Sequence, residues 1–109
     1  MLAKPTYTKE LLSRYAAGQR DFRNLNLIAA NLRNLNLSGI DLSGANLAKA
    51  NLTGTNLSRA KLMNTVLTGA KLTNTNLSQA NLTNVDLSGV DLKSATLHGT
   101  IIPQSASQA

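Results

Sequence analysis

The sequence lacks cysteine and has little histidine or aromatic content: one histidine, two tyrosines and one phenylalanine in 109 residues. The absence of cysteine excludes a disulfide framework, thiolate metal ligands and thiol chemistry. One histidine, His98, is too few for a multi-histidine metal site or a proton relay. The three aromatic residues all lie within the first 22 positions, so everything that follows must build its core from aliphatic side chains.

Long apolar stretches and acidic residues are scarce as well. No run approaches the roughly 20 apolar residues of a membrane-spanning helix, and the N-terminus lacks the apolar region of a signal peptide. We therefore expect one small cytoplasmic domain with no membrane association. Eleven Lys and Arg residues stand against five Asp and Glu, which gives a net charge of +6.

What the sequence does contain is a five-residue repeat. From Phe22 onward every fifth residue is large and apolar, without a gap. A period of five fits neither the 3.6 residues per turn of a helix nor the simple alternation of a strand. We expect these residues to form the core: Phe22, Leu27, Leu32, Leu37, Leu42, Leu47, Leu52, Leu57, Leu62, Leu67, Leu72, Leu77, Leu82, Leu87, Leu92 and Leu97.

Each unit reads as a short extended segment followed by a corner. A small residue and then Asn or Asp usually precede the large residue, and Ser or Thr with Gly or Asn mostly follow it. In an extended segment the small and the large residue point inward together, while Gly and Asn tolerate the positive φ of a tight turn. The small inward residues alternate between Ala and Thr from Ala50 to Ala80, so like residues recur every ten. This recurrence favours four sides per coil over three.

Units such as Ala45-Asn46-Leu47 and Ala80-Asn81-Leu82-Thr83-Asn84 resemble those of the pentapeptide-repeat family. The resemblance covers residues 20–99, and it implies an all-β fold, a right-handed quadrilateral β-helix of about four coils. The segment 15–22 is similar to cyanobacterial members. Some members inhibit type II topoisomerases by mimicking duplex DNA, but a chain of net charge +6 is not expected to be a DNA mimic.

Three segments are expected along the chain. Residues 1–19 form an N-terminal segment with a short capping α-helix, for which Thr8 is the N-cap and Gly18 the stop. Residues 20–104 form the pentapeptide-repeat β-helix, and residues 105–109 form a flexible C-terminal tail.

The repeat argues against an enzyme. An interior filled by Leu and Ala leaves no pocket in which titratable groups could converge. Asp86 and Asp91 lie one unit apart on adjacent sides, and His98 lies at an outward corner. We expect no catalytic residues, no cofactor and no metal.

The function that remains is a non-enzymatic structural or protein-interaction module with an unknown protein partner. Apolar residues at outward positions are candidates for an interaction surface. On one side these residues are Ile28, Ala29, Ala48 and Val66, and at the C-terminal end they are Ile101 and Ile102. Because no second helix covers that end, an end-to-end homodimer through the C-terminal coil is one expectation.

The alternative function is weak nucleic-acid or anion binding through the basic N-terminal region. The densest group of cations there is Arg14, Arg20, Arg23 and Arg33. The repeat surface carries no aromatic platform for stacking bases, and its charges are scattered. Both features argue against specific nucleic-acid binding.

Overall fold

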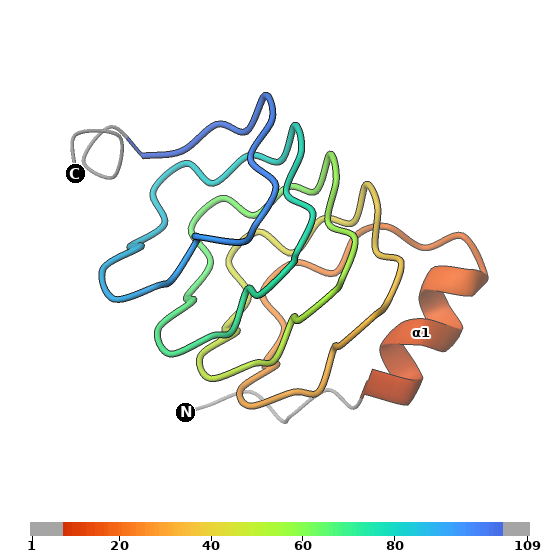
Figure 1. The fold of residues 1–109 in the computed structure, drawn as a ribbon. Helices are drawn as coiled ribbons and strands as arrows, with labels where there is room; N and C mark the ends of the chain where they lie inside the picture. Colours follow the sequence, from red (N-terminus) through yellow and green to blue (C-terminus); the bar gives the residue numbers. More distant parts are fainter. Residues whose placement is uncertain (1–7, 104–109) are drawn as a thin grey trace.

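The structure, a computed structural model, describes residues 8–103. It is a β-helix solenoid with one α-helix at its N-terminal end (Figure 1). Parallel β-bridges join residues twenty apart, from Asp21 with Asp41 to Asn81 with Ile101. One coil therefore takes twenty residues, as four five-residue rungs. We number the coils 1 (21–40), 2 (41–60), 3 (61–80) and 4 (81–100), and we name the sides A to D after the coil 1 rungs 21–25, 26–30, 31–35 and 36–40.

Three main-chain hydrogen bonds join a regular rung to the rung above it. On side B the N–H groups of Leu47 and Lys49 donate to Val66 O and Thr68 O, both at 2.8 Å, and Val66 N–H donates to Ala45 O at 3.0 Å. We call these three the ladder bonds of a rung. They satisfy the main chain in a segment too short to be a conventional strand.

The corners are made by residues in the left-handed region. The residue two places after each inward side chain has a φ between 54° and 74° at every corner from position 24 to position 99, except position 94. In most units an Asn or Asp supports the corner, because its side-chain oxygen accepts from the N–H two residues on, as Asn46 does from Ala48 at 3.0 Å. The five-residue period is thus a repeated turn.

Leucine ladders fill the interior. Phe22 and every inward leucine from Leu27 to Leu82 are at most 2% exposed. The buried threonines are satisfied as well, since the Thr75 hydroxyl donates to Leu52 O at 2.7 Å. The core expected from the sequence is wrong in its last three members, because Leu87, Leu92 and Leu97 are only half-buried. They belong to the last coil, which has no complete coil above it.

The helix α1 (Thr8–Ala16) lies across the start of coil 1 (Figure 1). Leu11 is fully buried against the core, and the Tyr15 hydroxyl donates to Ser38 O at 2.6 Å. The helix ends in a Schellman motif at Gly18, in which Gln19 N–H reaches Arg14 O at 3.0 Å. The Thr8 hydroxyl, expected at the N-cap, donates to Asn31 O at 3.0 Å and so ties the helix to coil 1.

The bridged part of the chain runs from Asp21 to Ile101. Residues 1–7 and 104–109, which include the expected C-terminal tail, lie outside the described residues. Between residues 8 and 103 there is no helix of the length and apolarity that a membrane span requires.

Candidate interaction surfaces

Side B carries an exposed apolar patch. Val66 stands in the same ladder column as Asn26 and Asn46, and Ala29 N–H donates to Ala48 O at 2.8 Å. Ile28 and Val66 are 41% and 42% exposed, Ala29 is exposed, and Ala48 is half-buried. The four residues therefore share one side over coils 1 to 3. We call this group the side B patch.

The C-terminal end is open, whereas the N-terminal end is covered. Ile101 pairs with Asn81 and begins a fifth coil, and it is 54% exposed, while Ile102 is half-buried. Because only side A receives this extra rung, Leu82 beneath it is fully buried, but the leucines of the other three sides remain half-buried. Apolar side chains and unpaired main-chain edges meet there.

Residues 86–95 depart from the regular stack. Bridges hold coil 4 on coil 3 on either side of them, at Lys61 with Asn81 and at Asn76 with Thr96. Within residues 8–103 no bridge forms between positions 66 and 86 or between positions 71 and 91. Three ladder bonds on side B and three on side C are consequently missing. Figure 1 shows this corner of the last coil standing away from the coil next to it.

A cavity of about 420 Å³ lies at this opening. Val66, Leu67 and Thr68 of coil 3 line it together with Asn84 and Asp86 of coil 4. Its volume falls within the range of about 300–1,000 Å³ that is usual for ligand pockets. Hydrogen bonds from the side chain and the N–H of Ser88 lower the pKa of Asp86, so its carboxylate stays charged at neutral pH. We call the space between coil 3 and residues 86–95 the slot.

The four arginines of the expected basic patch do not gather into one cationic surface. Arg14 pairs with Glu10 at 2.5 Å, and Arg23 pairs with Asp21 at 2.9 Å. This pairing lowers the pKa of Asp21 and raises that of Arg23, chiefly through the side-chain hydrogen bond. The pairs neutralise two of the cations before any ligand arrives.

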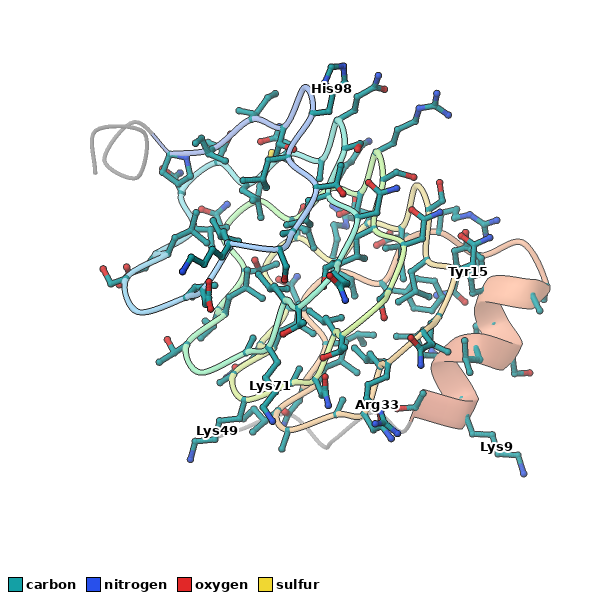
Figure 2. All side chains as sticks on the ribbon, in the orientation of Figure 1. Lys9, Tyr15, Arg33, Lys49, Lys71 and His98 are labelled. Carbon is teal, nitrogen blue, oxygen red and sulfur yellow. The ribbon has the colours of Figure 1, made fainter. Side chains whose placement is uncertain are left out.

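The other two arginines lie apart from each other. The Arg20 guanidinium stacks on the Tyr15 ring at 3.7 Å and donates to Tyr15 O at 2.9 Å. Arg33 lies on side C, and Figure 2 shows it on a different part of the surface from Tyr15. Figure 2 also labels Lys49 and Lys71 on other parts of the repeat, so the cations are spread along the stack.

The titratable side chains are dispersed. No three His, Cys, Asp or Glu residues within the described chain lie close enough together to hold a metal ion. His98 projects from an outward corner of coil 4 (Figure 2). Asp86 and Asp91 each accept the N–H two residues on, at 2.9 Å, which is the corner-supporting role that Asn and Asp play in other units of the repeat.

Comparison with known proteins identifies the repeat. The sequence model of the family described as pentapeptide repeats matches residues 21–59 and 60–99, in eight copies. The chain belongs to the pentapeptide-repeat family. The resemblance drawn from the sequence and the β-helix solenoid are thereby confirmed. No curated protein matches the chain significantly.

Solved structures of pentapeptide repeat proteins from cyanobacteria are similar to this chain. HetL from Nostoc sp. strain PCC 7120, which is involved in heterocyst differentiation regulation, is 32% identical over 87% of this chain, with a TM-score of 0.71. The chain spans about half of HetL, 46% of its length. The alr5209 protein of Nostoc PCC 7120 is 33% identical over 94% of this chain and 90% of its own, with a TM-score of 0.46. Rfr23 of Cyanothece 51142 is 37% identical over 77% of this chain and 60% of its own, with a TM-score of 0.28.

Sequence reasoning missed the slot, although one residue signals it. Most corner positions hold Gly or Asn, the others hold Ala, Lys, Arg or Gln, and Ser94 is the only serine among them. It is also the only corner from 24 to 99 without a positive φ. Ser94 is therefore the one corner of the described repeat that departs from the left-handed conformation.

Proposed function

We propose that the chain is a non-enzymatic protein-interaction module whose C-terminal coil stacks on a protein partner, in the first instance a second copy of the chain. The observation that carries this proposal is the difference between the two ends. Helix α1 seals coil 1 with Leu11 fully buried, whereas the other end presents Ile101 at 54% exposure over half-buried leucines. Burying such an edge removes apolar surface from water and pairs free main-chain groups.

The sealed end limits how such a module assembles. Since α1 blocks stacking at coil 1, contact through the open ends gives a pair and not a filament. Two identical open ends can meet about a two-fold axis. A rod that acts by contact needs no catalytic group, in keeping with its dispersed titratable residues and leucine-filled interior.

The side B patch is the second surface of this proposal. Ile28 and Val66 are similarly exposed and lie on one side, so a partner could lie along the rod as well as on its end. Rigid solenoids commonly bind partners along such a side. The two surfaces are separable by mutation because they share no residue.

Sedimentation velocity tests the assignment. We expect the native chain to form dimers in the micromolar range and the double variant Ile101→Lys, Ile102→Lys to be monomeric. Ile28→Lys is the control, because it adds a positive charge at an exposed apolar side chain on side B, away from the open end, and it should leave the dimer intact.

A native chain that stays monomeric throughout that range would exclude self-association through the end. A dimer that Ile28→Lys dissociates, and that the double variant leaves intact, would move the interface to side B.

A further inference from the structure

The slot exposes main-chain groups that are paired everywhere else on these two sides. One coil lower, the N–H groups of Leu47 and Leu52 donate to Val66 O and Lys71 O at 2.8 and 2.9 Å. The equivalent N–H groups of Leu67 and Leu72 donate to no acceptor among residues 8–103. Coil 3 thus ends in an open strand edge across sides B and C.

The facing rung is open as well. Within the described chain the N–H groups of Asp86 and Asp91 have no acceptor, although their counterparts Val66 and Lys71 donate to the coil below at 3.0 and 2.9 Å. The slot is therefore bounded by two strand edges whose ladder donors have no acceptor among residues 8–103. The bridged rungs at Asn81 and Thr96 fix both ends of the opening.

Ser94 lies at the end of the opening, where coil 4 returns to coil 3. Its hydroxyl oxygen accepts the Asn74 N–H at 3.0 Å. One coil lower the equivalent N–H, that of Gly54, donates to a main-chain carbonyl, Thr73 O, at 2.9 Å. At this corner a side-chain oxygen takes the place of the main-chain carbonyl that is the acceptor one coil lower.

We propose that the slot binds an extended peptide segment of a partner protein, which enters as an additional strand between coil 3 and residues 86–95. An extended main chain is the ligand whose donors and acceptors alternate to match two open strand edges. This inference rests on the proposed interaction function and specifies the partner's form. The slot also adjoins the side B patch, since Val66 belongs to both.

The side chains around the slot favour one pattern in the segment. Inward positions would lie between the leucines of coils 3 and 4 and so call for an apolar residue. At the outward position between Val66 and Asp86, a lysine packs its aliphatic stem on Val66 and brings its ammonium group to the Asp86 carboxylate. A basic residue followed by an apolar one is the expected motif.

Amide hydrogen exchange of the free protein tests the opening itself. We expect the N–H groups of Leu67 and Leu72 to exchange at least about 100-fold faster than those of Leu47 and Leu52, their equivalents one coil below. Equal protection of the two pairs would mean that the slot is closed in solution, and would overturn the proposal.

Binding is tested with a defined probe, an acetylated and amidated peptide that copies residues 70–79 and so contains Lys followed by Leu. We expect it to shift the amide resonances of Leu67, Gly69 and Leu72. In the peptide, the N–H groups at the positions copied from Lys71 and Asn76 would donate to the main-chain carbonyls of coil 3. Methylating these two nitrogens removes both donors and should weaken binding at least about tenfold. No binding, or equal binding by the methylated peptide, contradicts strand addition.

A disulfide lock localises the probe. Thr68→Cys with Ser88→Cys joins two outward positions of side B across the slot, in a chain with no cysteine of its own. The control, Ser38→Cys with Ser58→Cys, joins equivalent positions of side D, whose hydroxyl oxygens lie 3.1 Å apart. Oxidation should abolish peptide binding by the first variant and leave the second unaffected.

Ser94→Gly closes the slot by a second route, since glycine restores the positive φ of the corner. It should also abolish peptide binding. Binding that survives both the oxidised lock and Ser94→Gly would place the peptide elsewhere. Failure of the peptide to bind, with the end-to-end dimer intact, would overturn this inference and leave the proposed function standing.

Discussion

Replacing Leu57 with alanine tests how much of the fold's stability the inward ladders carry. Leu57 is fully buried, and Leu37 and Leu77 in the same ladder column are buried as well. The truncation removes three carbons, which at about 0.8 kcal/mol for each buried carbon costs about 2.4 kcal/mol. The cavity that remains raises the cost to about 3–4 kcal/mol, because the coils on both sides are held by their ladders and cannot collapse into it.

The matched control is Leu92→Ala in the last coil. Leu92 is half-buried and has no coil above it, so its truncation opens no enclosed cavity and should cost about 1 kcal/mol. Thr73→Ala, at an exposed outward position, should stay within about 0.5 kcal/mol. Urea unfolding followed by circular dichroism measures all three free energies of unfolding. A cost for Leu57→Ala no larger than that for Leu92→Ala would refute the ladder as the main source of stability.

Three further perturbations probe the cap, a corner and an ion pair. Tyr15→Phe removes the half-buried hydrogen bond to Ser38 O and should lower the free energy of unfolding by about 1 kcal/mol, measured in urea. Ala29→Gly relieves a φ of 59° and should raise the melting temperature, since about 1–2 kcal/mol of strain exceeds the roughly 0.5–1 kcal/mol of lost chain entropy. The Arg23 hydrogen bonds hold the folded pKa of Asp21 below its usual 3.8, so this contribution to stability is present above about pH 4 and is lost as the pH falls through the folded pKa. Acid titration of Asp21→Asn should therefore show a smaller loss of stability than the native chain.

The repeat itself was predictable from the sequence because a period of five leaves few options. Sixteen consecutive large residues at that spacing cannot form one face of a helix or of a strand. The small inward residues and the Gly or Asn corners then define a coil, and the structure has inward leucines buried from Leu27 to Leu82. Local chemistry repeated often enough determines this architecture.

The surface was less predictable because it depends on pairings between distant residues. The side-chain hydroxyl of Thr8 is well placed in sequence to cap α1, but its contact lies 23 positions away at Asn31. The sequence gives no partner for Arg20, whereas in the structure its guanidinium stacks on the ring of Tyr15. One such pairing was visible in principle, since Glu10 and Arg14 stand at the i,i+4 spacing of a helical ion pair.

The slot shows how a single local deviation spreads through a stack. Ser94 at a corner is a minor substitution in the sequence, yet six ladder bonds are missing over sides B and C. A rung is held by its ladder bonds and by the packing of its inward side chains. The rung of residues 91–95 and the rung before it, residues 86–90, therefore leave the stack together. The composition of one unit therefore does not reveal the size of the opening.

The position of the slot in the last interface of the stack follows from the energetics of a solenoid. Each coil contacts only its neighbours, so an irregular rung inside the stack disturbs the interfaces both below and above it. At about 1 kcal/mol for each main-chain hydrogen bond, six missing bonds cost about 6 kcal/mol in coil 4 and about twice that in coil 2. Open strand edges therefore destabilise the stack least when they lie in the last coil. Segments of low local stability are also where binding sites tend to lie. Because the last coil has only one neighbouring coil, the open end and the slot occur together, at the end of the rod opposite α1.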